Sequence, residues 1–123
     1  MQRIIFLILL LLSSMQMSAT DIAPVSAAFK AGNASALAAM FDSEVDVAIP
    51  GSTKTCSSRE AVEALNAFFS AGKPSGFTVV HNADKKDSGF IVGKLATPKG
   101  EFRVNISYRV EGNKAIIQSV RIE

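Results

Sequence analysis

Residues 101–111 read Glu-Phe-Arg-Val-Asn-Ile-Ser-Tyr-Arg-Val-Glu, and apolar and polar side chains alternate along the whole stretch. A period of two is typical of a β-strand that buries one face and exposes the other. The apolar face of this strand carries Phe102, Val104, Ile106, Tyr108 and Val110. The polar face carries Arg103, Asn105, Ser107 and Arg109.

Further strands are predicted on both sides of this stretch. Gly112-Asn113 follows it as a tight hairpin turn, and the turn sequence at 97–100 precedes it. Farther towards the N-terminus, residues 44–49 alternate in the same way until Pro50-Gly51 ends the strand. The predicted strands are residues 44–49, 77–83, 89–97, 101–111 and 115–122.

Two helices are predicted before the first strand. Asp21 can cap the first helix, in which apolar residues recur at steps of three and four from Ile22 to Phe29. Gly32-Asn33 ends this helix and starts the second one, over residues 34–41.

A third helix begins at a capping box. Ser57 and Glu60 have the S-x-x-E spacing in which each side chain bonds the backbone of the other residue. The helix runs to about residue 71 and ends at Gly72 and Pro74. Early helices and late antiparallel strands predict one α+β domain, with three N-terminal helices packed on one face of the sheet.

Residues 1–19 have the composition of a secretory signal. Arg3 supplies a charge, nine apolar residues run from Ile4 to Leu12, and Ala19 is a small residue suited to cleavage. The run is less than half of the roughly 20 residues that span a bilayer, so no stable membrane anchor is expected. The alternative, a core helix, suits an all-round apolar run poorly. We expect an exported protein, periplasmic or extracellular, with a single domain over residues 20–123.

Charge and cysteine content exclude several classes of function. Without Arg3, 12 basic residues stand against 11 acidic ones, which gives no electrostatic case for nucleic acid. Cys56 is the only cysteine, so no intramolecular disulfide can form. Its place at a helix start gives a nucleophile some physical basis, but an incidental thiol is the preferred interpretation. One histidine and scattered carboxylates show no ligand spacing, so neither a metal nor a cofactor is expected.

The order of elements and two local patterns resemble the nuclear-transport-factor-two-like superfamily, which includes steroid isomerases and polyketide cyclases. The first pattern is Phe29-Lys30-Ala31-Gly32-Asn33, followed by Leu37, Phe41-Asp42 and Val45. The second is the capped helix with a paired aromatic end, Ser57 through Phe68-Phe69. The resemblance covers nearly all of residues 21–122. It implies a strongly curved antiparallel sheet, a cystatin-like cone, and a small bacterial exported family of unknown function.

The resemblance also implies a ligand pocket inside the cone. Isomerase chemistry is not expected there, because Ile49 occupies the position of the family's general base and Val25 that of a hydroxyl donor. Tyr108, the only tyrosine, lies far away on a late strand. The expected pocket residues are Val45, Val47, Ile49, Phe68, Phe77, Val79, His81 and Phe102.

His81 is the one side chain that titrates near neutral pH. By strand parity it shares a face with Phe77 and Val79, which makes it the only candidate for acid–base catalysis. The alternative is a half-buried histidine near a strand end.

Three hypotheses about function follow. The preferred one is a non-catalytic exported domain that binds a small apolar ligand or a protein partner. The second is a small isomerase- or dehydratase-like enzyme that uses His81. The third is a cone filled by Phe68, Phe69, Phe77 and Phe102, with no pocket. The polar row from Arg103 to Arg109 is either solvent-exposed or a homodimer interface on the outer sheet face.

Overall fold

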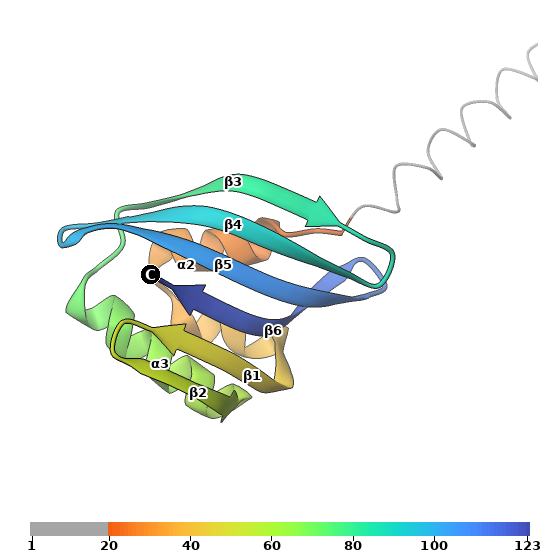
Figure 1. The fold of residues 1–123 in the computed structure, drawn as a ribbon, viewed down its shortest axis with the longest axis horizontal. Helices are drawn as coiled ribbons and strands as arrows, with labels where there is room; N and C mark the ends of the chain where they lie inside the picture. The colour runs from red at the N-terminus through yellow and green to blue at the C-terminus, as the bar shows by residue number, and fades with distance from the viewer. Residues whose placement is uncertain (1–19) are drawn as a thin grey trace, which may run out of the picture.

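The computed structural model describes residues 20–123 (Figure 1). The predicted signal, residues 1–19, lies outside the described residues. The elements are α2 (Ala23–Ala31), the 3₁₀ helix η1 (Ala34–Met40), β1 (Phe41–Ile49), β2 (Ser52–Ser57), α3 (Ser58–Ala71), β3 (Gly76–Asp84), β4 (Ser88–Thr97), β5 (Gly100–Glu111) and β6 (Lys114–Ile122).

The strands form one curved, unclosed sheet of six strands in the order β2-β1-β6-β5-β4-β3. All neighbouring pairs are antiparallel except β1 and β6, which run parallel. The helices lie on one side of this sheet, as Figure 1 shows, and the opposite side carries no helix. We call this opposite side the uncovered face. Within residues 20–123, no helix is long and apolar enough to cross a membrane.

The predicted α+β class is confirmed, as are the helix from the capping box and the four-strand meander β3–β6. At the capping box, the Ser57 hydroxyl accepts a hydrogen bond from the Glu60 N–H at 3.3 Å. The Glu60 carboxylate accepts one from the Ser57 N–H at 3.0 Å. These two bonds satisfy backbone donors that a helix start otherwise leaves unpaired.

Residues 52–57, which none of the predicted strands includes, form the edge strand β2. Pro50-Gly51 ends β1 as predicted, and it also turns the chain back into β2, since Ile49 pairs with Ser52. Gly51 has φ of 87°, the value that the third position of a type II turn requires. In β2 only Cys56 is buried, so the segment lacks the alternation by which the other strands are recognised.

Two helix predictions also need correction. The N-cap of α2 is Ile22, although the Asp21 carboxylate does accept a hydrogen bond from the Ala23 N–H at 3.0 Å. The second helix ends at Met40, and β1 begins at Phe41, three residues earlier than predicted. The third helix, α3, follows two strands rather than the one strand predicted before it.

The core lies between the helices and the inner face of the sheet. The ring of Phe29 on α2 packs edge-on to Phe69 of α3, with centroids 5.8 Å apart. It also stacks on Phe77 of β3 at 5.3 Å. Two glycines of β4 leave room for large rings, because a Cβ on Gly93 would overlap Phe77 and a Cβ on Gly89 would overlap Tyr108.

Candidate functional site

His81 does not share a face with Phe77 and Val79, contrary to the prediction from parity. Strand β3 contains a bulge after Val79, which pairs with Gly93, because the next paired residue is His81, opposite Val92. One extra residue in a strand moves every later side chain to the other face. His81 is therefore exposed on the uncovered face, with its ring centroid 5.5 Å from that of Phe90.

The other seven predicted pocket residues come together in one apolar core. Val45, Val47 and Phe77 are buried, and the remaining four are partly buried against the same core. The rings of Phe68 and Phe102 meet edge-on, with centroids 5.3 Å apart. Both rings line a surface hollow of about 250 Å³ at the C-terminal end of α3.

The bulge also turns Asn82 and Asp84 towards the inner face, where they meet Tyr108 of β5. The Tyr108 hydroxyl donates a hydrogen bond to Asp84 Oδ1 at 2.6 Å and accepts one from Asn82 Nδ2 at 3.1 Å. The bond from Tyr108 holds the pKa of Asp84 below its usual value, while burial raises the pKa of Tyr108. Tyr108 is only 1% exposed, whereas Asn82 and Asp84 are exposed at the end of β3.

The uncovered face contains a groove of about 570 Å³ across β2, β1, β6 and β5. Its floor is low because Ala48, Ser107 and Ser119 have small side chains. Asp46 stands at one wall, where its Oδ1 accepts a hydrogen bond from the Thr55 hydroxyl at 2.7 Å. Further lining residues are Thr53, Lys54, Asn105, Val120 and Arg121.

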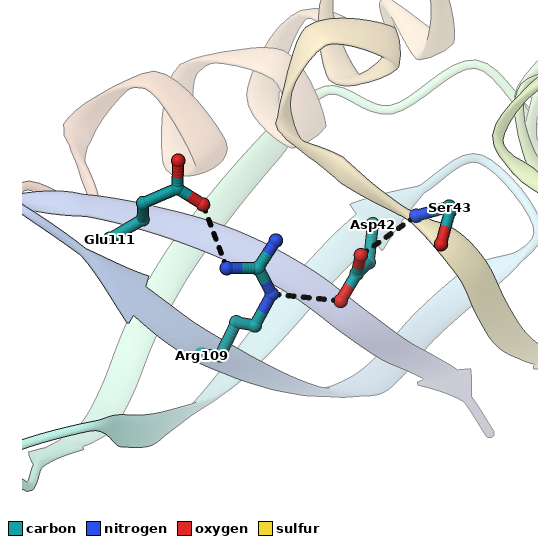
Figure 2. Close-up of polar contacts among 4 residues, drawn as sticks. All are labelled: Asp42, Ser43, Arg109 and Glu111. Atoms are coloured by element: carbon teal, nitrogen blue, oxygen red, sulfur yellow. Dashed lines mark hydrogen bonds and ion pairs between the residues drawn. The ribbon is translucent and has the colours of Figure 1, made fainter.

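Beside the groove, Arg109 of β5 joins two carboxylates (Figure 2). Its Nε donates to Asp42 Oδ2 at 2.9 Å, and its Nη1 donates to Glu111 Oε2 at 2.7 Å. The Ser43 N–H donates to the other oxygen of Asp42 at 2.8 Å. Because β6 lies between β1 and β5, the Arg109–Asp42 pair spans a strand. These bonds hold the pKa of Asp42 below its usual value and raise the pKa of Arg109.

The predicted polar row on β5 is thus divided between two environments. Asn105 and Ser107 line the groove, whereas Arg109 is held by its ion pairs. Arg103 lines a second hollow of about 400 Å³, together with Val80 and Val92.

The apolar part of the uncovered face lies on β3 and β4. Among residues 20–123, the only exposed large apolar side chains are Val80, 56% exposed, and Phe90, 39% exposed. Phe90 points away from the core because its neighbours Gly89 and Ile91 pair on the inner face with Tyr108 and Ile106. Sequence reasoning missed both residues, since each lies in a strand whose other apolar residues are buried or partly buried.

Cys56 and the acidic residues form no reactive or metal-binding cluster in the described part of the chain. Cys56 is a buried free thiol, and burial raises its pKa, which opposes a nucleophilic role. Residues 20–123 contain no group of three or more histidine, cysteine, aspartate or glutamate side chains that could hold a metal ion.

Solved structures similar to this chain support the fold. A DUF4783 family protein from Bacteroides uniformis is 37% identical, with a TM-score of 0.77 over 81% of this chain and 93% of that one. One from Bacteroides ovatus is 34% identical, with a TM-score of 0.76 over 81% of this chain and 91% of that one.

A more distant similarity shows the fold alone. A hypothetical protein with a ketosteroid isomerase-like fold from Catenulispora acidiphila is 17% identical, with a TM-score of 0.60 over 83% of this chain and 82% of that one. The fold is that of the nuclear-transport-factor-two-like superfamily, as the resemblance in the sequence implied. A comparison with curated proteins found no match.

The model of one protein family, described as "Domain of unknown function (DUF4783)", matches residues 22–123. This match includes every strand of the sheet and nearly all of the described residues. Together with relatives that are more than 30% identical, it shows that the chain belongs to the DUF4783 family.

Proposed function

We propose that this chain is a non-catalytic domain of an exported protein, and that its uncovered face binds a second copy of the chain. One observation carries the proposal: both exposed large apolar side chains of residues 20–123, Val80 and Phe90, lie on the face that no helix covers. Exposed apolar patches with a polar rim are typical of protein-binding surfaces.

The charges of this face are arranged for self-association. Glu44 and Asp46 lie on β1, and the next position along the sheet pairs Ala48 with Arg121 of β6. Consider a two-fold axis that runs across the strands between these two positions. It would place Asp46 over the partner's Ala48 and beside the partner's Arg121, and the same contact between Asp46 and Arg121 would form a second time by symmetry.

The alternative of an isomerase-like enzyme finds little support in the same geometry. Acid–base catalysis needs a titratable group that can reach a bound substrate. His81 is exposed beside Phe90 on the uncovered face, and the buried Tyr108 hydroxyl is already engaged in a hydrogen bond to Asp84.

The interior of the proposed cone favours a packed core over a large ligand pocket, since Phe29 contacts both Phe69 and Phe77. The hollow beside Phe68 and Phe102 is the place for a small apolar ligand. A partner that binds the uncovered face would leave this hollow open.

The test is the molar mass of residues 20–123 in solution, measured by light scattering or sedimentation over a range of concentrations. We expect twice the mass of one chain for the wild type and a shift towards the monomer for Phe90→Glu. Ala67→Glu, at an exposed position of α3, is the matched control and should leave the mass unchanged. A wild-type protein that stays monomeric at high micromolar concentration would refute the proposal.

A charge exchange tests the orientation of the two copies. Asp46→Arg and Arg121→Asp should each weaken the dimer, and the two changes together should restore part of the affinity. No recovery in the double variant, with both single variants folded, would rule out this two-fold arrangement.

A further inference from the structure

Thr20 and Asp21 join the ends of two hairpins. The Asp21 N–H donates a hydrogen bond to the Asn113 carbonyl in the β5–β6 turn at 2.9 Å, and Asp21 forms a parallel bridge with Lys114. The Thr20 nitrogen donates to Asp84 Oδ2, at the end of β3, at 3.1 Å. The first two residues after the predicted cleavage position therefore have defined places between β3 and β6.

The carboxylate of Asp84 is oriented so that one oxygen accepts a hydrogen bond from the Thr20 nitrogen. Its Oδ1 is taken by the Tyr108 hydroxyl at 2.6 Å, which fixes the orientation of the group and leaves Oδ2 towards Thr20. Tyr108 in turn is held by Asn82. The bonds from Tyr108 and Thr20 both lower the pKa of Asp84, so the carboxylate is charged at neutral pH.

We infer that Asp84 is a binding site for the mature N-terminus, which signal cleavage creates at Thr20. The inference rests on the export that we propose. A signal peptidase hydrolyses the Ala19–Thr20 bond: the hydroxyl of water goes to the Ala19 carbonyl carbon, and a proton goes to the Thr20 nitrogen. The products at neutral pH are an Ala19 carboxylate and a Thr20 α-ammonium group. In the uncleaved chain the Thr20 nitrogen lies 3.1 Å from Asp84 Oδ2.

Cleavage thereby replaces a hydrogen bond from a neutral amide with a charge-assisted one, which is the stronger kind. The position of the cut matters, because one extra residue carries the ammonium group roughly 3.5 Å farther along the chain. A cut after Thr20 would remove the donor altogether. The ion pair with Asp84 therefore forms in a chain that starts at Thr20, and not in chains that start one residue earlier or later.

The first experiment produces the full chain, residues 1–19 included, in a bacterium with an export pathway. Intact mass and N-terminal sequencing of the exported protein should give residues 20–123. A mature protein that starts at another residue would overturn the inference, and retention of residues 1–19 would also refute the proposed export.

The second experiment isolates the ion pair in three purified proteins. One starts with a free Thr20, one keeps Ala19 before it, and one carries an acetyl group on Thr20. We expect the free Thr20 protein to unfold at a temperature higher by about 1–5 °C at pH 6.5. This difference should vanish in Asp84→Asn and persist in the matched control Asp87→Asn.

The difference should also disappear near pH 10, where an α-amino group is neutral. A partner anion raises the pKa of such a group in the folded state, so its stabilisation is present at lower pH and lost as pH rises. The other charged or titratable groups at this end of the neighbouring elements are Asp21, Lys85, Lys86, Asp87, Tyr108, Arg109, Glu111 and Lys114, and all three proteins share them. Equal unfolding temperatures, or a difference that survives Asp84→Asn, would refute the site while leaving export untouched.

Discussion

Gly93 lies directly under the ring of Phe77, where no larger residue fits. A Cβ at this position would overlap the edge of that ring and come within 3.1 Å of the Thr78 carbonyl. We predict that Gly93→Ala lowers the free energy of unfolding by about 1–3 kcal/mol, because an overpacked core must shift its side chains or backbone. Urea denaturation of residues 20–123, with the variant compared to the wild type, measures this loss.

Gly76→Ala provides the matched control on the neighbouring strand. A Cβ on Gly76 would meet nothing within 4 Å, so that variant should unfold at a urea concentration close to that of the wild type. If Gly93→Ala is as stable as Gly76→Ala, the close contact between β4 and the Phe77 ring is not present in solution.

At the scale of single residues, the predicted face of His81 was wrong, and the hydrogen bonds of Asp84 were not predicted. A bulge adds one residue without any composition of its own, so strand parity after Val79 could not be predicted from the pattern. The bond between Asp84 and Tyr108 joins residues 24 positions apart in the chain and depends on that bulge. The buried face of β5 was predictable, because the alternation of β5 is unbroken through Val104, Ile106 and Tyr108. The register shift opposite Ser107 and Tyr108 lies in β6, between Ile117 and Ser119.

Among the strands, β2 is the one that could not be predicted from the sequence. It is an edge strand with a single buried side chain, Cys56, and both of its faces read as polar. As an edge strand, β2 is held by its backbone hydrogen bonds to one partner, β1, and its side chains are mostly exposed. It therefore shows no apolar alternation. The capped helix α3, in contrast, was predictable from Ser57 and Glu60, since both of its start signals are local.

The pair between Asp42 of β1 and Arg109 of β5 makes sheet stability depend on pH. Its hydrogen bonds lower the pKa of Asp42 in the folded state, so the stabilisation is present above the unfolded pKa and is lost as pH falls. We predict that Asp42→Asn loses less stability than the wild type between about pH 5 and pH 2. Thermal unfolding at a series of pH values measures the two slopes.

Glu44→Gln is the control for this comparison, because Glu44 lies on the same strand and forms no ion pair within residues 20–123. Its slope should match that of the wild type. The role of the Asp42–Arg109 pair would be refuted if Asp42→Asn and the wild type lost stability in parallel down to pH 2. High salt should reduce the wild-type slope, since both side chains are partly exposed.

For the whole molecule, the α+β class and the superfamily were predictable because they depend on element order and on local start and stop signals. The faces used for binding were not. The aromatic residues expected around a pocket instead pack against other rings, as Phe77 does against Phe29 and Phe68 against Phe102. Whether rings line a space or fill it depends on distances between elements, which a periodic pattern does not contain.

A filled interior has a consequence that mutation can test. We predict that Phe77→Ala lowers the free energy of unfolding by about 3–5 kcal/mol, because it leaves a cavity over Gly93 and beside Phe29. An apolar cavity of this kind stays dry and accepts a small aromatic molecule such as benzene. Benzene should therefore raise the unfolding temperature of Phe77→Ala and have no such effect on the wild type.

Phe102→Ala separates a closed cavity from a mere loss of ring surface. Phe102 is only partly buried and borders a hollow that already opens to the surface, so its removal should cost less stability and create no enclosed space. Benzene should then leave this variant unaffected. Stabilisation of the wild type by benzene to the same extent as Phe77→Ala would mean that the interior already holds a pocket, and the small-ligand hypothesis would replace the packed core.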